Sequence, residues 1–322
     1  ASKATLERLD RYTTDWLAMR RSTCRASASG ELSPELSDLK MACLDERLDA
    51  IGVVTRTLGA LEDARADAAA RVGNVLGDLE QCANPKGLRV RSGAGPAEIE
   101  RTRALRAQLV EVHVLLQQGF FDRAMPAFDA VVAEARTHKL EVVEAEALMG
   151  RSVVLAQSRR PGGTEGFHQV LAIAERLGDA ALRVDALGAL LADAAIDRAR
   201  ATETELLARL IETGLAELPG PQLMRRARIA GNLANYYLDK RDYPAAERSA
   251  DTAEKAFREQ LGPLHPYTLM ARETQASIQS MQGHQDKAIA ITGAILVELR
   301  RAYGESHPLL AQYELGHGVW LG

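Results

Sequence analysis

The stretch LGPLHP at residues 261–266 decides the fold, because it returns as YGESHP at residues 303–308, 42 positions later. The same offset relates a pair of small residues and a pair of turns: Ala246 with Ala288, and Lys240–Tyr243 with Gly283–Gln285. Three coincidences at one offset in a helical sequence indicate an internal repeat of helical hairpins.

Such a repeat follows from how a hairpin buries its apolar face. One hairpin cannot do so alone, so copies stack and each covers its neighbour. Glycine or a polar turn ends a helix through a left-handed cap, and Pro266 and Pro308 begin the next helix, where a missing N–H costs nothing. His265 and His307 recur with this linker, which predicts a capping or packing role for both.

The bulk composition limits the possible functions. At 322 residues the chain is long enough for two ordinary domains or one elongated repeat array. A net charge of −4 excludes a strong general field for nucleic acid, and the arginine run at 225–228 reads as a solvated helix face. The sequence has no apolar run long enough for a membrane span, and residues 1–10 do not resemble a signal peptide.

The first 82 residues predict a bundle of three antiparallel helices, at about 3–24, 34–59 and 62–82, from apolar residues at helical spacing. Ser33 before Pro34 is a good N-cap for the second helix. Residues 83–96 (ANPKGLRVRSGAGP) predict a linker and a domain boundary.

Residues 97–322 predict a solenoid of hairpins, because turn residues recur at the spacing of single helices. Its repeats are divergent over 97–220 and clear over 221–308, and a truncated last repeat occupies 309–322. Residues 159–166 (RRPGGTEG) read as an insertion.

The clear repeats resemble tetratricopeptide repeats of the kinesin-light-chain type, whose linker has the form LG-x-x-HP. The resemblance is carried by GNLANYY at 231–237, by DY at 242–243 and by AAE at 245–247, and GFFDRA at 119–124 resembles the same hairpin turn. It implies an all-α fold: a right-handed superhelix of tandem hairpins, preceded here by the three-helix bundle.

The N-terminal part carries a second resemblance, through Trp16, Cys24, MACLDERL at 41–48, CAN at 82–84 and Leu88. This string resembles the segment after the membrane helix in bacterial, myxobacterial-type serine/threonine protein kinases with C-terminal tetratricopeptide arrays. The resemblance implies an upstream kinase domain and a transmembrane helix, neither of which is in this sequence. Since the chain does not begin with Met, we expect it to be part of a larger protein.

The cysteines at 24, 43 and 82 have no metal-knuckle spacing, which leaves buried thiols or one disulfide with a spare thiol. If the segment is extracytoplasmic, as the kinase resemblance implies, we expect a disulfide. Cys24–Cys43 is the first choice, because a helix–loop–helix turn can bring these residues together, and Cys24–Cys82 is the second.

The sequence predicts no enzyme in this segment, no cofactor and no metal site. It has no phosphate-binding glycine loop, no kinase signature and no nucleophile elbow, and its seven histidines form no HExxH or HxxxH pair. His113 reads as a core residue. The carboxylates, such as Glu46 and Glu254 with Arg258, read as surface helix pairs.

The predicted functional surface is the concave face, formed by the first helix of each hairpin. In the family, Asn residues of this helix bond the backbone of an extended peptide, which carries over to Asn232 and Asn235, with Arg228 and Asp239 on the same face. The positions 42 residues later are Thr274 and Ser277, which depart from the Asn pattern, so a weaker clamp is expected there.

Two functions fit these patterns. The first is a peptide- or protein-binding sensor or scaffold of a membrane serine/threonine kinase, extracytoplasmic, with a disulfide and a possible homodimer, and without nucleic acid. The second is a cytoplasmic scaffold or peptide-receptor module of an unrelated regulator, with reduced cysteines.

Overall fold

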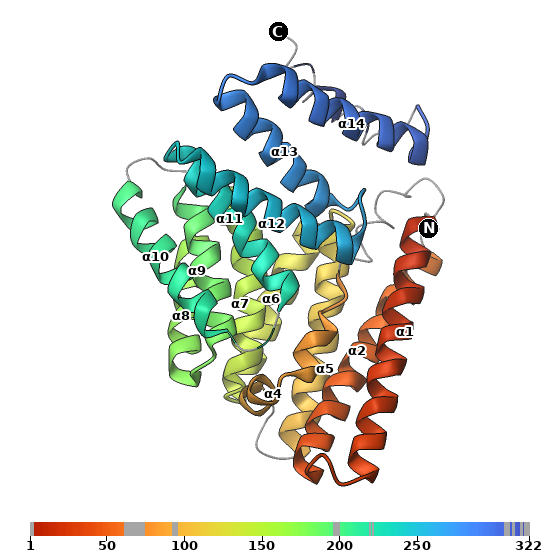
Figure 1. The fold of residues 1–322 in the computed structure, drawn as a ribbon. Helices are drawn as coiled ribbons and strands as arrows, with labels where there is room; N and C mark the ends of the chain where they lie inside the picture. The colour runs from red at the N-terminus through yellow and green to blue at the C-terminus, as the bar shows by residue number, and fades with distance from the viewer. Residues whose placement is uncertain are drawn as a thin grey trace. The chain divides into compact units, whose positions relative to one another are not determined.

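The computed structural model describes residues 3–60, 75–91, 96–195, 200–218, 220, 222–305, 310, 313–315 and 318. Within these residues every assigned element is a helix, which confirms the all-α prediction (Figure 1). The elements are α1 (Lys3–Ala28), α2 (Pro34–Ala60), the 3-10 helix η3 (Leu79–Ala83), α4 (Pro85–Arg91), α5 (Pro96–Gln117), α6 (Phe121–Thr137), α7 (Glu141–Gln157), α8 (Gly163–Leu177), α9 (Ala180–Ala194), α10 (Ala201–Glu217), α11 (Leu223–Asp239), α12 (Tyr243–Leu261), α13 (Pro266–Met281) and α14 (Gln285–Tyr303).

The chain forms two compact units. The first comprises residues 1–190 with 217–220, and the second comprises residues 191–216 with 221–322. The first unit therefore contains both the N-terminal helices and the hairpins of α5 to α8. The second contains the clear 42-residue repeat.

The N-terminal pair α1 and α2 forms as the sequence predicted. The Ser33 hydroxyl accepts a hydrogen bond from the N–H of Leu36 at 3.2 Å, which confirms the N-cap before Pro34. The indole N–H of Trp16 donates to the carbonyl of Leu44 at 2.7 Å, so the one large aromatic of this core also fixes α1 against α2.

The third predicted helix, at 62–82, is wrong in its last part. Its first part lies outside the described residues, and the remainder ends in the short η3, capped by Asp78, whose side chain accepts from the N–H of Glu80 at 2.9 Å. The predicted linker at 83–96 contains α4 instead of irregular chain throughout. The Asn84 side chain accepts from the N–H of Gly87 at 3.3 Å, and Pro85 begins the helix.

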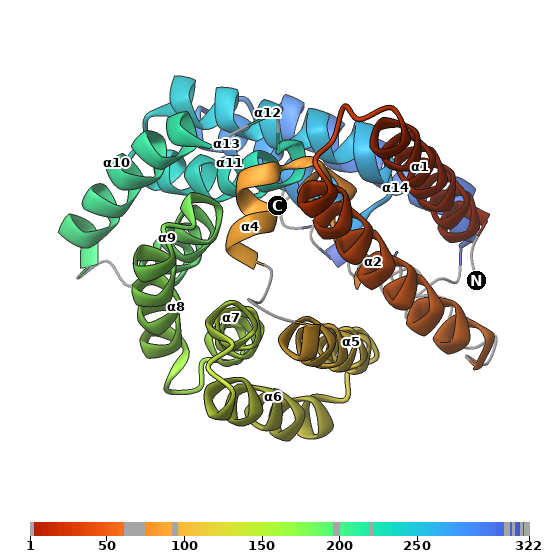
Figure 2. The same cartoon turned by 90° about the horizontal axis from the view of Figure 1, so that it is seen from below.

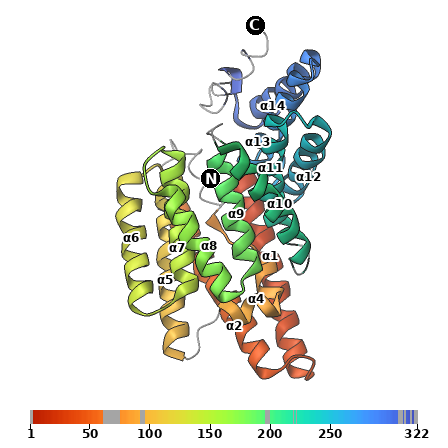
Figure 3. The same cartoon turned by 90° about the vertical axis from the view of Figure 1, so that its left-hand side faces the viewer.

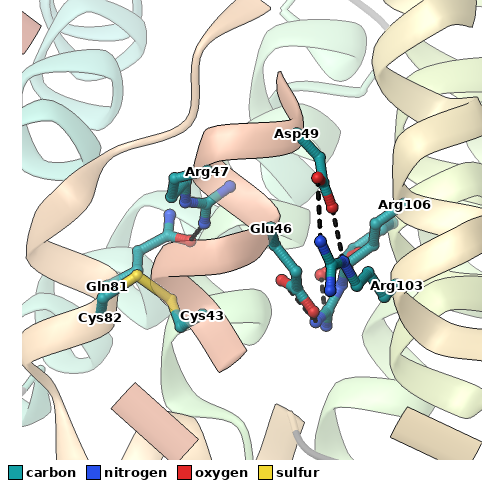
Figure 4. Close-up of polar contacts among 9 residues, drawn as sticks. Cys43, Glu46, Arg47, Asp49, Gln81, Cys82, Arg103 and Arg106 are labelled. Atoms are coloured by element: carbon teal, nitrogen blue, oxygen red, sulfur yellow. Dashed lines mark hydrogen bonds and ion pairs between the residues drawn. A yellow bond between two sulfur atoms is a disulfide. The ribbon is translucent and has the colours of Figure 1, made fainter. Parts of the chain in front are cut away.

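The disulfide joins Cys43 on α2 to Cys82 in η3, with a Cα–Cα distance of 5.6 Å (Figure 4). Both predicted pairings, Cys24–Cys43 and Cys24–Cys82, are therefore wrong. Cys24 is an exposed free thiol four residues before the end of α1. Arg47 donates to Gln81 at 3.0 Å beside the disulfide, so η3 is attached to α2 both covalently and by a hydrogen bond.

A largely buried ion-pair network joins α2 to α5 and α7. Arg106 on α5 bonds Glu46 of α2 at 2.8 and 3.0 Å and Glu146 of α7 at 3.0 and 3.2 Å. Burial opposes the charge of this guanidinium, but the two carboxylates outweigh it and raise the pKa of Arg106. The surface-pair interpretation of Glu46 is therefore wrong, because its side chain is only 14 % exposed.

The hairpins α5–α6 and α7–α8 pack consecutively, and the first helices α5 and α7 also contact each other. Figures 2 and 3 show α6 on one side of α5 and α2 on the other. The core between them centres on Phe128 and Val170 and includes many alanines, which let the helices approach closely. His113 packs edge-on against Phe128, with ring centroids 5.5 Å apart, in agreement with its predicted core role.

The predicted insertion at 159–166 is wrong in its second half. The chain turns through Gly162, which has φ 94°, and α8 begins at Gly163. Gly166 is buried in this first turn against Ser152 of α7. The glycines of this stretch therefore allow α8 to lie close to α7, rather than forming a loop.

The second unit realises the 42-residue repeat in helices α11 to α14. The helices α12 and α14 begin and end 42 residues apart, and Ala246 and Ala288 both have no exposed surface at the hairpin contact. Gly262 and Gly304 end them with φ 96° and 82°. The first helices α11 and α13 contact each other directly, as stacked hairpins require.

The first copy of the linker between hairpins, residues 261–266, has the predicted helix-capping structure. The His265 ring accepts from the N–H of Tyr267 at 3.1 Å, and α13 begins at Pro266. The capping role of His265 is confirmed. His307 and Pro308 lie outside the described residues.

Candidate functional site

The predicted binding residues of α11 occupy one helical face. Arg228, Asn235 and Asp239 are exposed and Asn232 is partly buried. Residues at these spacings lie above one another on a helix. The opposite side of α11 is buried against α12 through small residues, chiefly Ala227, Ala230 and Ala234, which leaves the polar face outward.

The two predicted residues of α13 are already hydrogen-bonded within their own helix. The Thr274 hydroxyl donates to the carbonyl of Met270 at 3.2 Å, and the Ser277 hydroxyl donates to that of Glu273 at 3.0 Å. Their donors are therefore engaged, unlike a free side-chain amide, which offers both a donor and an acceptor. The weaker clamp expected at this repeat stays a prediction.

Sequence reasoning missed two exposed methionines on the same helix. Met270 is 56 % exposed and Met281 is 49 % exposed. They stand 42 residues after Arg228 and Asp239, so the charged ends of the α11 face are replaced by apolar side chains on α13. The 42-residue offset from Arg228 and Asp239 identifies both positions in the sequence.

One carboxylate lies among these α13 residues. Glu273 is partly buried, and desolvation raises the pKa of its carboxyl. Burial also raises the pKa of the nearby Tyr313 hydroxyl, with a further contribution from the charge of Glu273. The neighbouring cation, Arg272, is held elsewhere, because it bonds both oxygens of Glu298 at 2.9 and 3.1 Å.

Two cavities lie elsewhere on the described chain, one of about 540 Å³ beside Arg258, Leu264 and Arg301, and one of about 500 Å³ beside Phe120 and Arg160. The predicted binding residues line neither of them.

Among the described residues, no group of three or more His, Cys, Asp or Glu side chains could hold a metal ion. In the same part of the chain, no helix combines the length and the apolar character that a membrane span needs. The surface pair expected between Glu254 and Arg258 is present at 3.2 Å.

Comparison with known proteins agrees with this geometry. Residues 225–291, which run from α11 into α14, match the family model of the tetratricopeptide repeat. A search of the curated proteins found no match. Within this all-α chain, the matched helices from α11 into α14 are helical repeats of the tetratricopeptide type, a fold that generally binds proteins or peptides and is typically not enzymatic.

Proposed function

We propose that the first helices α11 and α13 bind an extended segment of a partner protein. The observation that carries this proposal is the exposed polar face of α11, on which Asn235 lies between Arg228 and Asp239. A side-chain amide can donate to a peptide carbonyl and accept from a peptide N–H, so it reads an extended backbone without regard to side chains. The match to the tetratricopeptide family over residues 225–291 supports this use of the face.

The test replaces one amide and compares it with an amide on the other helix of the same hairpin. Asn235→Ala should weaken binding of a captured partner about tenfold, as expected for the loss of hydrogen bonds to one peptide group. Gln260→Ala, an exposed amide on α12, is the matched control and should leave binding unchanged. If Asn235→Ala lowers the melting temperature instead, Asn235 is structural and the assignment of the site fails.

We further propose that the module is the sensor or scaffold part of a membrane serine/threonine kinase and lies outside the cytoplasm. Partner binding would then bias the kinase through proximity or dimerisation. This proposal is supported by the resemblance of the N-terminal segment to bacterial membrane serine/threonine kinases. It is also supported by the Cys43–Cys82 disulfide, which joins two of the residues that carry this resemblance. Disulfides persist in oxidising compartments and are rare in the cytosol.

Two measurements separate this placement from a cytoplasmic scaffold. Alkylation of the native, unreduced chain followed by mass spectrometry should label Cys24 alone. Three labelled thiols would instead favour the cytoplasmic alternative. The genomic sequence before Ala1 gives an independent answer, since a kinase domain and an apolar helix of about 20 residues are expected there.

A further inference from the structure

Gly231 lies in the middle of α11, where a glycine is unfavourable because it orders a flexible backbone. Close packing explains two other helical glycines of this chain, although not Gly59 near the end of α2. A Cβ on Gly150 would lie 2.7 Å from the ring of Phe128, and one on Gly166 would collide with Ser152. A Cβ on Gly231 would meet nothing within 4 Å, so packing within the chain does not account for this glycine.

The position 42 residues after Gly231 is Glu273, so the two occupy equivalent places on consecutive first helices. Glu273 is partly buried, and burial alone is the cause of its raised pKa, with no ion pair opposing it in the described part of the chain. A carboxylate that is partly removed from water favours a cationic partner. Arg272 is not this partner, because it forms an ion pair with Glu298.

Apolar side chains flank this carboxylate along α13. Met270 lies one turn before Glu273 and Met281 lies two turns after it, and both are exposed. Methionine is flexible and polarisable, so it adapts to varied apolar side chains and to the aliphatic stem of a lysine or arginine. The rise of a helix places Glu273 and Met281 about 12 Å apart along the axis. That distance corresponds to about four residues of an extended chain.

We propose that this face selects a partner segment in which a lysine or arginine precedes or follows an apolar residue by about four positions. The basic group binds Glu273, the apolar side chain contacts Met281, and the segment's backbone passes over the open surface at Gly231. This inference rests on the proposed function and adds the chemistry of the partner to it. The partly buried carboxylate of Glu273, which has no ion pair among the described residues, is complementary in charge to a basic segment.

The test is a selection of phage-displayed random 12-residue peptides on the immobilised 322-residue chain, run in parallel on Glu273→Gln and Glu273→Lys. Peptides selected by the wild type should be enriched in a basic residue with an apolar residue three to five positions away. Glu273→Gln should lose the basic preference, and Glu273→Lys should select acidic peptides in its place.

Affinities of the selected peptides, synthesised and measured by fluorescence anisotropy, give the second readout. Glu273→Gln should weaken binding about tenfold. Gly231→Phe should abolish it by filling the backbone path, whereas the matched control Gly231→Ala should stay within about twofold, because its small methyl group reaches nothing. Circular dichroism checks that each variant keeps its helices.

The outcomes distinguish the inference from the function on which it rests. Peptides that lack a basic residue, or that bind Glu273→Lys as well as wild type, overturn the inference. If Asn235→Ala still weakens such peptides, the proposed function survives. Failure of the wild-type chain to enrich any peptide overturns both.

Discussion

The guanidinium of Arg106 and the carboxylate of Glu46 meet through two hydrogen bonds of 2.8 and 3.0 Å, in a position where each side chain is only 14 % exposed. The same guanidinium bonds Glu146, so one arginine bridges two carboxylates from different helices. Figure 4 shows Glu46 and Asp49 on the side of α2 that faces α5. This network and the apolar contacts of Val53 and Val54 with Val114 join the N-terminal helices to the hairpins.

We expect Arg106→Ala to destabilise the chain by about 3 to 5 kcal/mol, because it removes the guanidinium that bonds two largely buried carboxylates. Urea unfolding followed by circular dichroism measures this difference. Arg103→Ala is the matched control, since Arg103 also bonds a carboxylate of α2, Asp49, but that pair is 41 % and 33 % exposed. Arg103→Ala should lower the free energy of unfolding by about 1 kcal/mol or less. An equal loss of stability in both variants would contradict the burial argument.

The contact between Gly166 and Ser152 leads to a second prediction. A Cβ on Gly166 would lie far inside the 3.0 Å that real Cβ contacts respect, so Gly166→Ala should destabilise the chain by about 1 to 3 kcal/mol. The Ser152 hydroxyl is buried without a hydrogen-bond partner, so Ser152→Ala alone should be neutral or stabilising.

A double-mutant cycle tests the cause. In a Ser152→Ala background the nearest remaining atom is the Cβ of residue 152, at 3.2 Å, so most of the cost of Gly166→Ala should disappear. If the two effects simply add, the destabilisation comes from α8 itself and not from its approach to α7.

A third prediction compares one turn in two copies of the repeat. Arg241, in the turn between α11 and α12, has φ 61°. The equivalent residue 42 positions later is Gly283, which has φ 84°. A left-handed conformation is unfavourable for a residue with a Cβ, so Arg241→Gly should stabilise the chain by about 0.5 kcal/mol. Thermal unfolding measures this gain in stability. The control is Arg248→Gly, inside α12, which should destabilise the chain by about 1 kcal/mol.

A fourth prediction follows from the raised pKa of Glu273. Its folded-state pKa lies above the ordinary value of 4.5, so the folded chain binds the proton more tightly than the unfolded chain does. Stability should therefore fall as the pH rises through this window, and the ionised carboxylate then stays unfavourable at neutral pH.

Glu273→Gln should consequently raise the melting temperature at pH 7 and lose this advantage below about pH 4, where both states are protonated. Glu259→Gln, an exposed position on α12, is the control and should show no such dependence. A melting temperature that falls in Glu273→Gln at pH 7 would mean that the carboxylate has a stabilising partner.

Local signals predicted much of the fold from the sequence. The 42-residue offset located α12 and α14, and Ser33 before Pro34 located the start of α2. The same signal in Asn84–Pro85 marked α4, but the glycine and proline content of that stretch indicated a linker. The disulfide required the spatial path of residues 79–83 relative to α2, which no local pattern contains.

The candidate site was predictable only where the family pattern supplied a motif. Asn232 and Asn235 stand in such a pattern, whereas Met270, Met281 and Glu273 matter through their exposure or burial, which depends on how α13 packs. The unusual character of Gly231 is likewise visible only once its surroundings are known, because a glycine in a helix has many possible causes.

The bond between Cys43 and Cys82 also decides how the chain would respond to mechanical tension. A force applied at the N-terminus passes directly from α2 to η3 through the two sulfur atoms, whose Cα atoms are 5.6 Å apart. This covalent path bypasses the sequence between the two cysteines, which are separated by 39 residues. Reduction would release about 14 nm of extended chain, so this length stays hidden from a pulling force until the thiols are free.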